Sequence, residues 1–204
     1  MTFKTVFLVA FATAARRSEL HAISKDFSRD KKWTHVTLKM IDGFVAKNQL
    51  SDCHAQSFRS FVIKSLTDFT NSTGLTKEKL LCPVRALRIY SHRTLRNSEN
   101  TRLFVSFKEG HEKDLHQNTV SSWLKNTIKL CYELEGKTLP TKIVAHSVRS
   151  MSVSWARLKN VGTQKKMDSC FWKSPNVFIS FYLKDLTEVE GKMHKLGKLS
   201  FPTT

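Results

Sequence analysis

The sequence is short of the residues that mark secreted, membrane-spanning or disordered proteins. Only four of its 204 residues are cysteine, and no two form a Cys-x-x-Cys pair, so neither a disulfide framework nor a zinc ribbon is indicated. The longest uncharged run, Thr5 to Ala15, has 11 residues, well below the roughly 20 that span a bilayer. Fourteen phenylalanines and four tryptophans, spread along the chain, argue against disorder. We therefore expect a soluble globular domain with one sizeable core and no metal site.

Acidic residues are scarce as well. Against 17 Asp and Glu stand 34 Lys and Arg, which gives a net charge of +17 and favours a polyanionic partner such as nucleic acid. Between residues 84 and 108 Arg85, Arg88, His92 and Arg96 recur at helical spacing and would form one basic stripe. We expect Arg85, Arg88 and Arg96 to contact DNA phosphates. The alternative is a solvated basic face with nothing bound.

The first element is expected to be a buried helix. Residues 2–15 are apolar on nearly every side, unlike the one-sided pattern of a surface helix. This helix starts directly after Met1, without a capping residue in a preceding loop, so we expect that an upstream segment is missing.

A hairpin is expected next. Residues 33–39 alternate between polar and apolar like a strand, and Asp42-Gly43 predicts a turn into a second strand at 44–46. Residues 55–70 are ambiguous, because Phe58, Phe61 and Val62 follow a helical spacing.

Most of the remaining chain is predicted to be helical. Pro83 opens one helix, since proline favours the first turn, and Asn118 or Thr119 caps another that ends at Gly136. One further short strand is expected at 103–105. The predicted helices cover 83–96, 118–135, 146–160, about 163–171 and about 175–184. The fold class is therefore mainly α with a small antiparallel β-sheet (α+β).

A few side chains are candidates for chemistry, although each alone has an ordinary structural explanation. His146 and Arg149 lie three residues apart, which places an imidazole and a guanidinium on one helical face. Trp172 alone would be a core residue, and Tyr182 a packed aromatic whose hydroxyl reaches the surface. Their order along the chain is what makes them specific.

Near the start, Arg16-Arg17 is followed by Glu19, which alone would be a helix start with an ion pair. With the later residues in place, however, Ala-Thr-Ala-Ala-Arg-Arg-Ser-Glu-Leu (12–20) resembles the Ala-Thr-Gly-x-Arg-x-Ser-Glu-Leu motif of the tyrosine recombinase/integrase family. The resemblance runs from about residue 2 to 186 and is closest to the recombinases of DIRS/Ngaro-type retrotransposons. Four segments carry that closer resemblance: Arg-Ser-Glu-Leu-His-Ala (17–22), Leu-Cys-Pro-Val-Arg-Ala-Leu-Arg-Ile-Tyr (81–90), Leu-Phe-Val-Ser (103–106) and Ala-His-Ser-x-Arg (145–149).

The resemblance implies a catalytic set for DNA strand breakage. Tyr182 would attack the scissile phosphate and form a 3′-phosphotyrosine, which conserves the phosphodiester energy. Arg16 and Arg149 would place guanidinium forks on the phosphate oxygens, where charge develops in the transition state. His146 would donate to the same phosphate or take the tyrosine proton, and Trp172 would donate its indole N–H.

Other positions follow from the family pattern with alternatives. A lysine on the sheet hairpin would protonate the leaving 5′ oxygen; Lys47 is our choice and Lys39 its rival, because strand register is not set by one sequence. Glu19 would orient an arginine without touching substrate. The Ser-Glu-Leu register favours Arg16 over its neighbour, and Ala14 stands where the family has glycine.

The resemblance also sets expectations for the whole protein. Residues 1–186 would be the catalytic domain and 187–204 a C-terminal tail, and the N-terminal DNA-clamping domain of the family is absent. The partner would be double-stranded DNA, bound by a tetramer in the nucleus, with no cofactor. The alternative is a catalytically inactive, truncated or host-adopted module that binds duplex DNA. An RNA-binding protein has little support, because neither an RNP-type strand nor a Gly-x-x-Gly loop is present.

Overall fold

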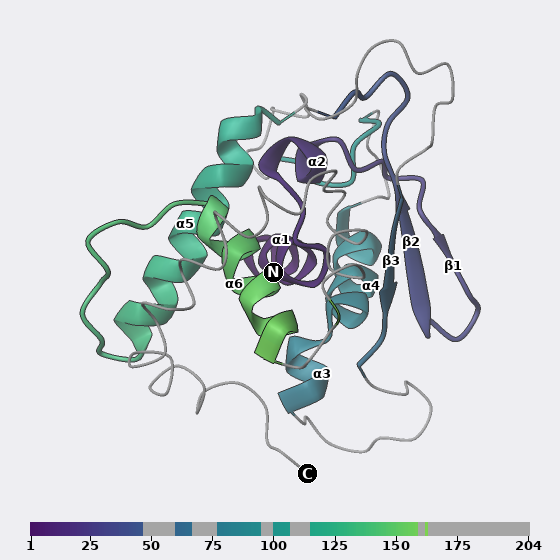
Figure 1. The fold of residues 1–204 in the computed structure, drawn as a ribbon. Helices are drawn as coiled ribbons and strands as arrows, with labels where there is room; N and C mark the ends of the chain where they lie inside the picture. Colours follow the sequence, from purple (N-terminus) through teal and green to yellow (C-terminus); the bar gives the residue numbers. More distant parts are fainter. Residues whose placement is uncertain (47–59, 67–76, 95–99, 107–114, 159–161, 163–204) are drawn as a thin grey trace.

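The chain folds as a set of helices packed around one central helix, with a small sheet on one side (Figure 1). The structure is a computed structural model, and it describes residues 1–46, 60–66, 77–94, 100–106, 115–158 and 162. The helices are α1 (Thr2–Thr13), α2 (Arg17–His21), α3 (Lys77–Leu81), α4 (Pro83–Thr94), α5 (Gln117–Leu134) and α6 (His146–Leu158). The strands are β1 (Ser28–Arg29), β2 (His35–Lys39) and β3 (Ser60–Lys64).

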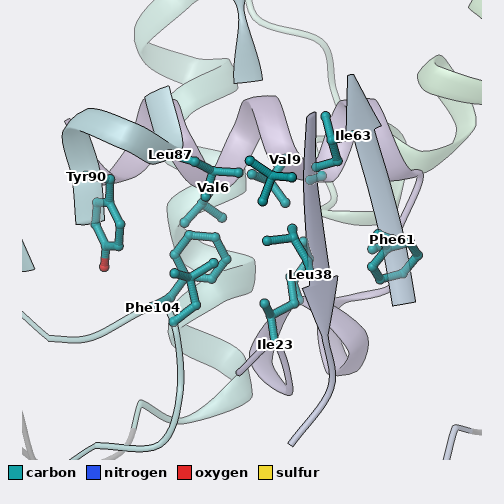
Figure 2. Close-up of a cluster of buried hydrophobic side chains, with 14 of the residues drawn as sticks. Val6, Val9, Ile23, Leu38, Phe61, Ile63, Leu87, Tyr90 and Phe104 are labelled. Carbon is teal, nitrogen blue, oxygen red and sulfur yellow. The ribbon is translucent and has the colours of Figure 1, made fainter. Parts of the chain in front are cut away.

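Helix α1 is the centre of the fold, as its apolar composition predicts. It contacts α4, α5, α6 and β3, and its residues Val6, Val9 and Ala10 are at most 1 % exposed. In Figure 2, Val6 and Val9 lie between Leu87 of α4 and Leu38 of β2. A helix that must bury several sides cannot carry a polar face, which explains the uncharged run.

The sheet is antiparallel throughout, in the order β1-β2-β3. In the β2–β3 pair, Val36 lies opposite Ile63 and Leu38 opposite Phe61, and these four side chains are all buried. The alternate position Val62 faces outward and is 62 % exposed. This period-two alternation lets one face of the sheet cover the core while the other meets solvent.

The expected hairpin is only half right. The turn after β2 exists, with Gly43 at φ 74° and the amide of Phe44 donating to the carbonyl of Ile41 at 3.3 Å, but residues 44–46 form no strand. The partner of β2 is β3 at 60–64, inside the ambiguous stretch. The strand wins there because its alternation buries two large side chains against β2, whereas a helix has no such partner.

Two smaller expectations are also wrong. Residues 103–105 are buried but form no strand; their neighbour Arg102 makes a single bridge with Ser24. The N-cap of α5 is His116, whose Nδ1 accepts from the amide of Asn118 at 3.2 Å, and not Asn118 or Thr119. An imidazole nitrogen satisfies an orphan amide as a carboxylate or hydroxyl would.

Other predicted helix boundaries are confirmed. Helix α4 begins at Pro83, α5 ends at Leu134 ahead of Gly136 (φ 60°), and α6 begins at His146. These signals are reliable because proline and glycine act on their own backbone. The helices expected near 163–171 and 175–184, and the tail, lie outside the described residues.

Helix α1 ends at a residue in the left-handed conformation. Ala14 has φ 49° and ψ 29°, which is the position where the related motif carries glycine. The Cβ of an L-residue there meets the following carbonyl, at a cost of about 1–2 kcal/mol. The departure from the motif thus leaves the turn in place and strains it.

Replacing Ala14 by glycine is expected to raise the free energy of unfolding by about 1 kcal/mol, because glycine reaches a positive φ without that clash. Chemical denaturation measures the change. Ala10→Gly is the matched control: Ala10 lies inside α1, so glycine there should lower the free energy of unfolding by about 1 kcal/mol. Equal destabilisation by both variants would contradict the assigned conformation.

Candidate active site

The candidate site is built on the short link between α1 and α2. Arg16 is the N-cap of α2, with extended backbone at φ −72° and ψ 158°. Its amide donates to Glu19 Oε2 at 2.6 Å, and its guanidinium Nη1 donates to Glu19 Oε1 at 3.1 Å. A carboxylate at the third residue of a helix reaches back to the cap amide, which is the reciprocal half of a capping box. Glu19 therefore holds both the backbone and the side chain of Arg16.

Arg149 of α6 reaches the same link from a distant part of the chain. Its Nη1 donates to the carbonyl oxygen of Ala14, 135 residues away, and lies 3.8 Å from Glu19 Oε2. Its side chain is only 2 % exposed. The last carbonyls of a helix have no intrahelical donor, and a cation there also interacts favourably with the negative end of the helix dipole. The C-terminal end of α1 is thus a favourable position for a guanidinium.

A second contact fixes α6 on α1. The hydroxyl of Ser152, three residues after Arg149 and on the same helical face, donates to the carbonyl of Phe11. Two side chains of α6 therefore satisfy carbonyls near the end of α1. This pair of bonds determines how α6 is rotated against the central helix.

The cluster carries a net positive charge. Two guanidinium groups share one carboxylate, so Arg16, Glu19 and Arg149 together carry a formal charge of +1. Glu19 is 1 % exposed, and a charge so deeply buried needs a partner. The side chain of Arg16 is 20 % exposed, so a solute can approach it. Through Arg16 the arrangement can bind an anion that accepts hydrogen bonds from a planar fork, of which a phosphate is the best match.

His146 and Arg17 are near members of this cluster along the chain, and both are exposed. His146 is the first residue of α6, is exposed, and is three residues before Arg149 on one helical face. Arg17 is exposed and donates from Nη1 to Asn118 Oδ1 of α5 at 3.3 Å. Of the two adjacent arginines, it is thus Arg16 whose side chain meets Glu19.

Of the other candidates, the structure describes Lys39, Arg85 and Arg88. Lys39 ends β2, opposite Ser60, and is exposed. Lys47, Trp172, Tyr182 and Arg96 lie outside the described residues, so their roles stay predictions.

One arginine of the basic stripe on α4 contacts Trp33, which lies between β1 and β2. Arg85 is half-buried, whereas Arg88 is exposed and its Cζ lies 5.8 Å from the centre of the Trp33 ring. The Cζ of Arg29 lies 4.5 Å from the same ring. Cation–π contacts of this kind order two guanidinium groups at the surface. The strand expected from residue 33 begins only at His35, and Trp33 precedes it with a positive φ of 57°.

Two contacts in the region of the site were not predicted from the sequence. His21 and Arg102 are hydrogen-bonded to each other at the far end of α2, and Ser152 binds α1. His21 stands inside the motif at 17–22, so its position there was the available signal. Arg102 counted only as one more positive charge.

Two kinds of feature are absent from the part of the chain that the structure describes. No group of three or more His, Cys, Asp or Glu side chains there is placed to hold a metal ion. Likewise, none of the described helices has both the length and the apolarity needed to cross a membrane.

Comparison with known proteins identifies the fold. Neither a protein-family model nor a curated protein sequence matches the chain. Among solved structures, it is similar to the XerH site-specific recombinase bound to palindromic difH substrate in a post-cleavage complex, with a TM-score of 0.57 and 14 % identity over 93 % of this chain and 45 % of that one. The pre-cleavage complex of XerH with difH substrate gives 0.56 and 14 %, over 91 % and 44 %.

These matches define the class of the protein at the level of its fold. The expected fold class, mainly α with a small antiparallel sheet and like a tyrosine recombinase catalytic domain, is confirmed. At 14 % identity the likeness concerns the fold and leaves residue roles open. The chain spans less than half the length of either XerH chain.

Removing the carboxylate should unbalance the cluster. Glu19→Gln leaves Arg149 buried without its anionic neighbour, so we expect the free energy of unfolding to fall by about 3 kcal/mol in chemical denaturation. The matched control is Glu135→Gln, because Glu135 pairs with Lys137 at 3.5 Å on the surface, where a pair is worth about 0.5 kcal/mol or less. A loss at Glu19 no larger than the loss at Glu135 would contradict the role given to this carboxylate.

Proposed function

We propose that this chain is the catalytic domain of a tyrosine recombinase, which breaks and rejoins DNA strands through a phosphotyrosine at Tyr182. One observation carries the proposal: the fold brings Arg16 and Arg149, which are far apart in the sequence, onto the same carboxylate. The recombinase-like fold and the net charge of +17 support the same conclusion. A structural ion pair needs one arginine, whereas a phosphate in transfer benefits from two.

The reaction balances without a metal or a cofactor. The Tyr182 oxygen forms a bond to the scissile phosphorus, the bond from phosphorus to the 5′ oxygen breaks, and the tyrosine proton leaves the phenol. A free tyrosine has a pKa of about 10, so cations near it must favour the phenolate. Arg16 and Arg149 supply positive charge both for that purpose and for the phosphate oxygens. The reverse attack by a 5′ hydroxyl rejoins the strand.

The remaining roles complete the proton transfers. His146, on the same face of α6 as Arg149, donates to the phosphate or accepts the tyrosine proton. Trp172 donates its indole N–H to the phosphate. The 5′ leaving oxygen receives its proton from Lys47 or, in the alternative, from Lys39 at the end of β2.

The wider setting follows from the motifs at 17–22, 81–90 and 145–149. A recombinase related to those of DIRS/Ngaro-type retrotransposons would act in the nucleus, on double-stranded DNA, as a tetramer. In this proposal the catalytic domain covers residues 1–186, the tail is 187–204, and an N-terminal DNA-clamping domain belongs to the complete enzyme. The stripe of Arg85, Arg88 and Arg96 would bind the phosphate backbone.

A second function is a duplex DNA-binding module without chemistry. The observation in its favour is the burial of Arg149, whose side chain is only 2 % exposed and already donates to a backbone carbonyl. Such a module would keep a steep fall of DNA affinity with salt. It would form no covalent adduct.

A covalent-trapping experiment separates the two functions. The full chain is incubated with nicked suicide duplexes and resolved on a denaturing gel. We expect a shifted protein–DNA band with the wild type, none with Tyr182→Phe, and an unchanged band with the matched control Tyr132→Phe, whose tyrosine lies on α5. Equal adduct from Tyr182→Phe would overturn the assigned nucleophile.

The absence of any adduct would favour the binding module, provided that the binding of the same duplex still weakens steeply with salt. To keep that result decisive, the assay is repeated with a DNA-clamping domain restored upstream. An adduct in that fusion alone would support the recombinase function, and no adduct in either form would reject that function.

A further inference from the structure

Helix α2 is too short to place itself. Its five residues include Glu19 in the candidate site and, two positions later, His21 as the last residue of the helix. An isolated helix of this length is unstable in water, so its position depends on contacts with the rest of the chain. Leu20 is fully buried, but apolar burial is non-directional and leaves the rotation of the helix undetermined.

Hydrogen bonds at His21 supply the missing direction. Its Nε2 bonds to the carbonyl oxygen of Leu115, and its Nδ1 lies 3.2 Å from Nη1 of Arg102. A carbonyl only accepts and a guanidinium only donates, so Nε2 carries the proton and Nδ1 is the acceptor. The geometry therefore selects one neutral tautomer of the ring.

The backbone of His21 is held as well. Arg102 Nη1 donates to the carbonyl oxygen of His21 at 3.0 Å, so one guanidinium binds both the side chain and the main chain of the last residue of α2. Leu115 directly precedes His116, the N-cap of α5. The partners of His21 are 81 and 94 residues away in sequence. The ring thus ties α2 to two distant segments.

We propose that His21 is a positioning residue for the candidate active site: with Arg102 and the Leu115 carbonyl it sets the rotation of α2, and so holds the Glu19 carboxylate between Arg16 and Arg149. Because one turn of helix separates the two ends of α2, a rotation at His21 moves Glu19 with it. The effect on DNA cleavage rests on the proposed function. The effect on the Glu19 bonds does not.

The amide of Arg16 reports directly on this geometry, since it donates to Glu19 Oε2. Hydrogen exchange followed by NMR measures its protection in the full chain, and the amide of Val9 in α1 serves as the internal reference. In His21→Ala we expect the Arg16 amide to exchange about tenfold faster while the Val9 amide changes little. The matched control is His35→Ala, a histidine of β2 beside Asp30, which should leave both amides unchanged.

Conservative variants distinguish positioning from simple loss of packing. Asparagine places an amide oxygen near Nδ1 and keeps the Arg102 bond, whereas glutamine places a donor near Nε2 and keeps the Leu115 bond. His21→Asn and His21→Gln should each restore part of the Arg16 protection. These two variants also carry the test if His21→Ala does not fold.

The outcomes separate this inference from the proposed function. Faster exchange at Arg16 alone, with partial rescue, supports the positioning role even if the wild type forms no adduct with DNA. If the wild type does form adduct, its rate should fall about tenfold in His21→Ala and recover in step with the amide protection. An unchanged Arg16 amide, or equal acceleration at Arg16 and Val9, would overturn the role of His21.

Discussion

One buried carboxylate, Glu19, is the interaction on which the candidate site depends. It accepts from the backbone and the side chain of Arg16 and lies 3.8 Å from the guanidinium of Arg149. Without it, two cations would face each other in a region of low dielectric, which is costly. With it, two planar forks from distant parts of the chain are held side by side and keep a net positive charge. Glu19 thus reduces the repulsion between the two guanidinium groups and leaves a net positive charge that attracts an anion.

The end of α1 provides the platform for this cluster. A helix terminus exposes carbonyls that nothing within the helix can satisfy, and here α6 supplies the donors through Arg149 and Ser152. The left-handed turn at Ala14 then redirects the chain so that Arg16 caps α2. Sheet and helices cover α1 on its other sides, so the link to α2 is where polar chemistry can gather (Figure 1).

How much was predictable follows from how local each feature is. The start of α4 at Pro83 and the end of α5 before Gly136 are written in single residues and were predicted. The partner of β2 was not, because strand pairing joins segments that no short window compares. The candidate site was predicted from the order of its motifs, and the structure adds that the guanidinium of Arg16 lies against Glu19. The contacts of His21 were missed because both of its partners are more than 80 residues away.

The central claim is that Arg16 and Arg149 act on one phosphate together. The most direct measurement is an NMR titration of the arginine Nε–Hε signals with orthovanadate, which mimics a phosphoryl group in transfer, using Arg16→Lys and Arg149→Lys to assign the two signals. The account predicts that both signals move along one saturation curve with a common dissociation constant. Movement of surface arginines such as Arg88 alone, or separate curves for Arg16 and Arg149, would contradict it.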